Sequence, residues 1–177
     1  MEEIKNNSEG VCKFSELERD LLSGRISNSD FIEEVLNVDQ SEPSRQSALE
    51  AVVLLSKPNI VELYINSPER ITFYSVRSLS YFHKAQIRLS FGEVGVEDDL
   101  VQALRDAEEV DDEVSKDWQD YIKATIFYLR NDLNRLKEVA ENITSNKSLV
   151  RNFVRGLEER GRPDYMLDYS KPREDNR

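Results

Sequence analysis

The sequence has few of the residues that form cross-links, bind metals or reverse the chain sharply. Its single cysteine, Cys12, cannot form an internal disulfide, and its single histidine, His83, leaves no Cys/His set for a structural zinc ion. Six glycines and five prolines among 177 residues agree with long helices. No apolar run approaches the roughly 20 residues that a membrane-spanning helix requires. We therefore expect neither a metal site nor membrane association.

Motifs of catalysis and targeting are missing as well. The chain has no phosphate-binding loop and no nucleophile motif, and its acidic runs do not follow the alternating ligand pattern of a calcium loop. Residues 1–14 lack the basic start and apolar core of a secretion signal. We therefore expect a cytoplasmic protein that is not an enzyme and binds no cofactor.

Acidic residues outnumber basic ones by 35 to 24, which gives a formal net charge of −11. With 38% hydrophobic and 33% charged residues, the chain has the charge content of a helix-rich globular protein and enough apolar material for a sizeable core. The negative charge is concentrated in residues 96–117, here named the acidic segment, which holds ten acids and two bases. We expect no nucleic-acid partner, because Lys and Arg supply most of the energy of phosphate binding.

The clearest helical pattern surrounds the only tryptophan. Apolar residues recur at helical spacing from Trp118 to Leu129, and the pattern resumes from Leu133 to Ile143 after the polar turn at residues 130–132. These two stretches predict a helical hairpin in which Trp118 is substantially buried. Because the hairpin carries apolar surface on more than one side, it needs neighbouring helices.

Similar patterns predict an all-α fold of about eight or nine helices. We expect a disordered N-terminus (residues 1–13), a single all-helical domain (14–162) and a flexible C-terminal tail (163–177). The first half of this tail could dock through its apolar and aromatic residues Tyr165, Met166, Leu167 and Tyr169. Within the domain, residues 14–66 form the N-terminal helices and residues 68–162 form the later hairpins. The helix ending near Leu55 is apolar on nearly every side, which favours a central position. Gly156, inside the last helix, costs up to about 1 kcal/mol relative to alanine and indicates either close packing or mild strain.

The later hairpins show weak internal similarity. Ala85 lies seven residues before Gly92, and Ala124 lies seven residues before Asn131. In the second helices, three positions match at a constant offset of 33 residues: Leu100, Ala107 and Val110 with Leu133, Ala140 and Ile143. This order of small residue, polar or glycine turn and second small residue resembles the tetratricopeptide-like (TPR-like) helical repeats. The resemblance implies antiparallel helical hairpins stacked into an α-solenoid that binds a protein or peptide partner.

The same resemblance implies a concave groove lined by the first helices of the hairpins. Its lining would include Phe82 and Gln86 from one repeat, and Tyr121, Thr125 and Tyr128 from the next. The Lys, Arg and Asn residues with which family members clamp a terminal carboxylate are absent here, so we do not expect that role. The alternative interpretation is that these side chains fill the core between hairpins, because aromatic residues at helical spacing are usually buried.

A basic row on the last helix is a further candidate for partner binding. Lys147, Arg151 and Arg155 recur every four residues on its polar side, where they could bind an acidic partner or a phosphate backbone. Alternatively, they form an ordinary solvated face in which the arginines pair with Glu158 and Glu159.

The acidic segment offers the opposite charge, and Asp111, Asp112 and Glu113 are its candidate partner-binding residues. Its excess of eight negative charges makes it the stronger electrostatic candidate of the two surfaces. The leading hypothesis is a non-catalytic adaptor or scaffold that binds another protein. The second hypothesis is a small acidic inhibitor or immunity-type protein that covers the active site of a basic enzyme with this segment.

Overall fold

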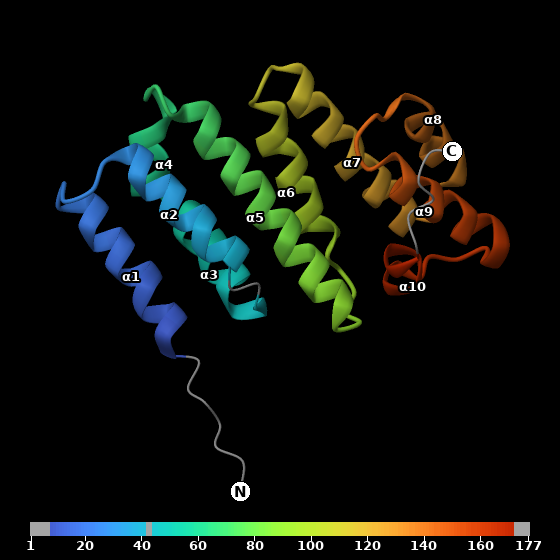
Figure 1. The fold of residues 1–177 in the computed structure, drawn as a ribbon, viewed down its shortest axis with the longest axis horizontal. Helices are drawn as coiled ribbons and strands as arrows, with labels where there is room; N and C mark the ends of the chain where they lie inside the picture. Colours follow the sequence, from blue (N-terminus) through green and yellow to red (C-terminus); the bar gives the residue numbers. More distant parts are fainter. Residues whose placement is uncertain (1–7, 42–43, 172–177) are drawn as a thin grey trace, which may run out of the picture. The chain divides into compact units, whose positions relative to one another are not determined.

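The computed structural model describes residues 8–41 and 44–171, in which all regular structure is helical. Ten helices follow one another along these residues (Figure 1): α1 (Ser8–Leu22), α2 (Asn28–Ser41), α3 (Arg45–Leu55), α4 (Pro58–Ile65), α5 (Arg70–Ser90), α6 (Glu97–Glu108), α7 (Glu113–Leu129), α8 (Leu133–Asn142), α9 (Lys147–Arg160) and α10 (Tyr165–Ser170). The prediction of an all-α fold is confirmed for this part of the chain. None of its helices is both long and apolar enough to cross a membrane.

The chain divides into two compact units where we expected a single domain. Unit 1 extends to Lys84 and unit 2 begins at Ala85, so the boundary lies inside the continuous helix α5. The sequence pattern placed the main break near residue 67 instead, because Pro68 follows a polar turn. Chain breaks mark where helices end, whereas units are defined by which helices pack together.

Unit 1 is built around aromatic side chains from three helices. Phe31 of α2, Tyr64 of α4 and Phe73 of α5 are fully buried, and the rings of Tyr64 and Phe73 stack at a centroid distance of 4.4 Å. The Tyr64 hydroxyl donates a hydrogen bond of 2.9 Å to the carbonyl oxygen of Asn28, so its one polar atom is satisfied. Around this cluster, α1 packs against α2 and α3.

A buried carboxylate joins α2 to α5 within unit 1. Asp39 Oδ2 lies 2.9 Å from His83 Nδ1 and accepts a hydrogen bond of 3.4 Å from the Ser80 hydroxyl. The only histidine of the chain is therefore engaged in a contact between two helices.

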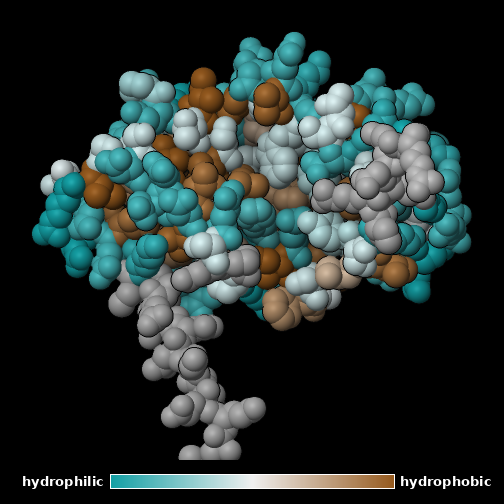
Figure 2. Space-filling view, viewed as in Figure 1, coloured by the Kyte–Doolittle hydropathy of each residue, from teal (hydrophilic) through white to brown (hydrophobic). Residues whose placement is uncertain are grey.

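Helix α3 is not surrounded on every side, in contrast to its predicted central position. Six of its side chains are buried, but Leu49 and Val53 are 45% and 53% exposed. These two residues are one helical turn apart, so one side of α3 faces outward. Figure 2 shows such apolar side chains at the surface of unit 1, in the left part of the view.

Consecutive helices of unit 2 pack against each other: α6 against α7, α7 against α8, and α9 against α7, α8 and α10. Three of these helices begin at an aspartate whose carboxylate accepts a hydrogen bond from the amide three residues on: Asp112, Asp132 and Asp164. Such caps satisfy amides that have no partner within the helix. Trp118 of α7 is only partly buried, which is less than we predicted.

Both ends of the helical region differ from the prediction. Helix α1 begins at Ser8, so residues 8–13 are helical rather than disordered. At the other end, residues 165–170 of the expected flexible tail form α10, in which Tyr165 and Asp168 are buried. A helix of six residues is too short to show a periodic pattern, and its contacts with α9 stabilise it. The rest of the two expected tails, residues 1–7 and 172–177, lies outside the described residues.

Candidate interaction groove

An open groove of about 550 Å³ lies between α8 and α9 on the surface of unit 2. Charged side chains dominate its lining, which consists of Lys137, Ala140, Glu141, Lys147, Arg151, Val154, Arg155 and Glu158. The predicted basic row of α9 therefore forms one wall of a concave surface. In Figure 2, the part of the molecule that carries α8 and α9 is largely hydrophilic.

The apolar side of α8 fixes the other wall. Leu136 is fully buried, and Ile143, just beyond the end of the helix, is also buried. At the N-terminus, Asp132 Oδ1 accepts a hydrogen bond of 3.2 Å from the amide of Arg135. Because residues four apart share a helix face, Lys137 and Glu141 are presented together on the polar side of α8.

Asp117 of α7 holds the loop that leads into α9. Its carboxylate accepts three hydrogen bonds, from the amide and hydroxyl of Thr144 at 2.8 and 2.9 Å and from the amide of Ser145 at 2.9 Å. Burial alone would raise the pKa of Asp117, but these hydrogen bonds outweigh it and hold that pKa below its usual value. The charged carboxylate thereby fixes the loop at Thr144 and Ser145, directly before α9.

The inner side of α9 is anchored by apolar packing. Leu149, Val150 and Leu157 are buried, and the fully buried ring of Phe153 stacks on Tyr128 of α7 at a centroid distance of 4.5 Å. At the C-terminal end, Gly161 adopts a left-handed conformation with φ of 67°. This conformation is typical of the residue that ends a helix and favours glycine. The backbone that carries the basic row is therefore held at both ends and along its length.

The cations of the groove are only partly neutralised within unit 2. Lys137 Nζ of α8 lies 2.6 Å from Glu158 Oε1 of α9, so this pair bridges the two walls. Glu159 lies 3.7 Å from Lys171 of the following segment. Lys147 and Arg151 form no hydrogen bond or ion pair through their side chains with any described residue. The groove therefore keeps an excess of positive charge.

Lys147 stands where a cation is unfavourable. It is the first residue of α9, and the positive end of the helix dipole favours acids at that position. The first turn of α9 contains no acid, and the side chain of Asn146 makes no capping hydrogen bond there. A cation in the first turn of a helix, with no acid nearby to offset it, departs from the usual sequence preference, and such departures are typical of functional surfaces. The helix end and Lys147 thus add positive potential of the same sign at one end of the groove.

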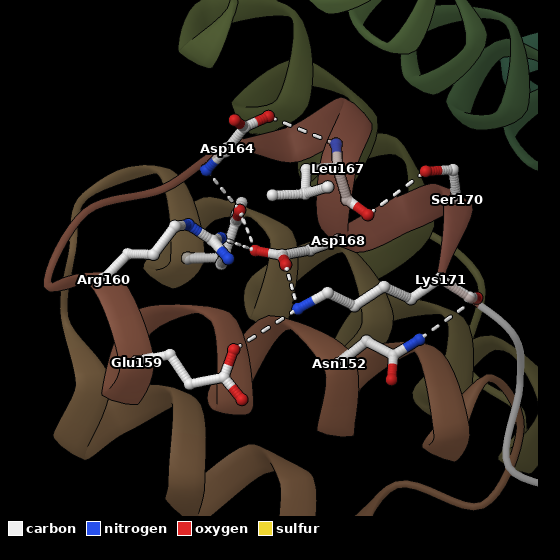
Figure 3. A network of polar contacts seen from close by, with 9 residues as sticks. Asn152, Glu159, Arg160, Asp164, Leu167, Asp168, Ser170 and Lys171 are labelled. Carbon is white, nitrogen blue, oxygen red and sulfur yellow. Dashed lines mark hydrogen bonds and ion pairs between the residues drawn. The ribbon is translucent and has the colours of Figure 1, made fainter.

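Helix α10 packs on another side of α9, where its buried carboxylate, Asp168, contacts residues of α7 and α9. Asp168 is fully buried, accepts a hydrogen bond of 2.6 Å from the Tyr128 hydroxyl, forms an ion pair with Arg160, and has Lys171 Nζ at 3.0 Å from its Oδ1. Figure 3 shows the side chains of Arg160 and Lys171 converging on this carboxylate. Asn152 of α9 donates a hydrogen bond of 3.4 Å to the carbonyl oxygen of Lys171. The network fastens the chain beyond Gly161 to α9.

Charge and shape both fix Asp168. Burial opposes its ionisation, but hydrogen bonds from Arg160, Tyr128 and Lys171 outweigh burial and hold its pKa below the usual value. The carboxylate occupies the space beside Gly156, where a Cβ atom would collide with it. The predicted close packing at Gly156 is confirmed, because no larger residue leaves room for the buried carboxylate.

The residues predicted to line a concave groove of first helices lie elsewhere. Phe82, Tyr121, Thr125 and Tyr128 are all buried, so their side chains are not accessible to a partner in this structure. The partly buried Gln86 donates a hydrogen bond of 2.9 Å to the hydroxyl of Tyr165. The alternative interpretation, that the aromatic side chains fill the core, describes their positions better.

The acidic residues singled out in the sequence are at the surface. Asp111, Asp112 and Glu113 are exposed where the chain enters α7, and Asp112 Oδ1 accepts the capping hydrogen bond of 2.6 Å from Ser115. At least five acids of the acidic segment are engaged within unit 2. Three join different elements, Glu97 with Arg130, Asp99 with Arg88, and Asp117 with Thr144 and Ser145, while Asp106 bonds Gln102 within α6 and Asp112 caps α7 at Ser115. The segment is therefore a smaller free negative surface than its composition indicates.

Sequence reasoning did not identify the α8 side of the groove. Lys137 and Glu141 are four residues apart, which marks a common helix face, but the same spacing occurs on many solvated helices. That this face meets the basic row of α9 depends on how the two helices pack.

Within the described residues, no group of three or more His, Cys, Asp or Glu side chains is placed to hold a metal ion. Comparisons of the chain with protein-family models, with curated proteins and with solved structures find no match. The groove between α8 and α9 is therefore assigned from its geometry and charge.

Proposed function

We propose that the protein is a non-catalytic adaptor or scaffold, built from TPR-like stacked helical hairpins, that binds another protein in the groove between α8 and α9. The observation that carries this proposal is the placement of Lys147 and Arg151. They lie in a concave surface without a partner among the described residues, on a helix whose other sides are anchored. The cytoplasm remains the proposed compartment.

A rigid backbone under a charged surface favours binding. Contacts of Asp117 with the preceding loop, the stacking of Phe153 and the cap at Gly161 hold the backbone of α9, so the backbone under the basic row is fixed before a partner arrives. A preorganised surface loses less conformational entropy on association, and this raises affinity without additional contacts. We infer a protein partner rather than a nucleic acid, because Glu141 and Glu158 lie in the same groove and the whole chain carries a charge of −11.

Affinity capture with matched charge-reversal variants tests this proposal. Arg151→Glu reverses an exposed cation in the groove, and Lys116→Glu reverses an exposed cation on α7 that does not line it. Wild type and K116E should retain a common partner from an extract of the producing cells, whereas recovery by R151E should fall about tenfold or more. Circular dichroism should show that both variants keep the wild-type helix content.

Equal capture by R151E and K116E would show that the groove is not the binding surface. Enrichment of no protein above the tag alone would also count against the proposal. Quantification by mass spectrometry distinguishes these outcomes from a partner that is lost only with R151E.

The second candidate function is inhibition of a basic enzyme by the acidic segment. It is supported by the exposure of Asp111 and Glu113, and by Val114, which is 81% exposed beside them. Asp111→Lys with Glu113→Lys tests it without removing the Asp112 cap of α7. This double variant should slow association with the enzyme strongly at low salt and weakly at high salt, because exposed charges are screened over roughly 8–10 Å. A salt-independent association rate would exclude this mechanism.

A further inference from the structure

We infer that the groove between α8 and α9 binds an acidic amphipathic helix of the partner protein. The inference rests on the proposed function and adds the chemistry of the partner. It follows from three features of the groove: the spacing of its cations, the apolar residues between its walls, and the position of its carboxylates.

The spacing of the basic row matches a helical ligand. Lys147, Arg151 and Arg155 recur every four residues, which is about 6 Å per step along α9. A partner helix that carries an acid at every fourth residue repeats the same distance, so two of its acids align with Lys147 and Arg151, which have no partner among the described residues. Each aligned acid of the ligand pairs with a cation of α9, and α9 is already anchored in unit 2.

The residues between the walls complete the match. Ala140 of α8 and Val154 of α9 line the groove and are only partly buried, so they offer apolar surface to a side chain from above. The small side chain of Ala140 leaves room for close approach of a third helix, as in helix packing generally, where axes lie about 8–10 Å apart. The ligand should therefore carry one or two apolar residues beside its acidic row.

The carboxylates of the groove define what the ligand is not. Glu141 lies on the α8 wall. There it would repel the phosphates of a nucleic acid and attract a basic side chain of a protein ligand. Glu158 already neutralises Lys137 at 2.6 Å, so the cations without a partner among the described residues are Lys147 and Arg151 on the α9 wall. A helix with acids toward α9 and one lysine toward α8 satisfies both walls, whereas a uniformly anionic polymer does not.

Titration with a synthetic helix tests the inference on the full-length protein. The probe is a fluorescently labelled peptide of roughly 16 residues, about four helical turns, with glutamate at every fourth position, leucine beside it and one lysine on the other flank. The control peptide has glutamine in place of each glutamate. A single-stranded oligodeoxynucleotide of similar length represents the phosphate backbone. Fluorescence anisotropy gives the affinities, and circular dichroism follows the helix content of the peptide.

The glutamate peptide should bind at least about tenfold more tightly than the glutamine peptide and the oligonucleotide. Arg151→Glu should weaken it about tenfold or more, and Lys116→Glu less than about twofold, because exposed charges outside the contact contribute little. The peptide should gain helix content on binding. Equal affinity of the two peptides, tighter binding of the oligonucleotide, equal effects of R151E and K116E, or binding without a gain of helix would each overturn the inference.

The peptide titration and the capture experiment fail in distinguishable ways. If no glutamate peptide binds but R151E still loses a captured partner, the acidic-helix inference is refuted and the proposed function is retained. If R151E changes neither peptide binding nor capture, both are refuted.

Discussion

Replacing Gly156 by alanine tests how α10 is held on α9. The added Cβ would collide with the Asp168 carboxylate, which is fully buried and bound to Tyr128, Arg160 and Lys171. Alanine by itself favours a helix interior by about 1 kcal/mol relative to glycine, so propensity alone predicts a more stable protein. The collision lowers the free energy of unfolding, whereas the higher helix propensity of alanine raises it.

Displacement of Asp168 costs more than the gain in helix propensity. Forcing extra volume into a packed site costs about 1–3 kcal/mol, and separating a buried ion pair adds up to about 3–5 kcal/mol. The second figure is reduced here, because the side chains of Arg160 and Lys171 are 22% and 24% exposed and their charges can be hydrated. After subtraction of the propensity gain, we expect Gly156→Ala to lower the free energy of unfolding by about 2–3 kcal/mol.

Urea denaturation followed by the fluorescence of Trp118 measures this change in unit 2, because the chain has one tryptophan and it lies in α7. The matched control is the same substitution in an Asp168→Ala background, where the collision is absent. In that background alanine should be neutral or stabilising by up to about 1 kcal/mol. A stable G156A variant, or an equal loss of stability in both backgrounds, would refute the role of the Asp168 carboxylate.

Three further predictions concern the same unit. Phe153→Ala should lower the free energy of unfolding by about 3–5 kcal/mol, because it empties a fully buried aromatic site. Trp118→Ala should lower it less, because that side chain is only partly buried. Similar losses of stability for the two variants in urea denaturation would contradict this order. Asp117→Ala should cost about 1–3 kcal/mol in thermal unfolding through the loss of three hydrogen bonds at the start of α9, and an unchanged melting temperature would exclude that anchoring role. The pKa of Asp168 is lower in the folded protein than its unfolded value of about 3.9, so its network stabilises the fold fully above about pH 5, and this stabilisation is lost as the pH falls below about 4. Asp168→Asn should therefore flatten the dependence of stability on pH in the acid range, and an acid limb as steep as that of the wild type would show that other carboxylates dominate.

The helices themselves could be predicted because they depend on local patterns. The stripes around Trp118 and Leu136 follow the 3.6-residue period of a helix. Gly156 was identified as a packing site from its unfavourable propensity alone, and the structure supplies the atoms that require it. Helix α10 was missed because six residues contain too few turns for a period to be seen.

Only one wall of the candidate site, the basic row of α9, could be predicted from the sequence. The basic row of α9 is visible in the sequence, because cations four residues apart share a helix face whatever the fold. Whether aromatic residues such as Tyr121 and Tyr128 line a groove or fill a core cannot be read from spacing, since both arrangements have the same period. Tertiary packing placed them in the interior, where removal from water stabilises them most.

The sequence by itself determined an all-helical fold and the separation of its charges into a basic row and an acidic segment. Each of these depends on residues within a few positions of one another. The tertiary structure decided which acids are used as caps and ion pairs, that Glu158 pairs with Lys137 across two helices, and that Lys147 and Arg151 face an open groove. These outcomes depend on distances between helices that are far apart along the chain, and no local pattern encodes those distances.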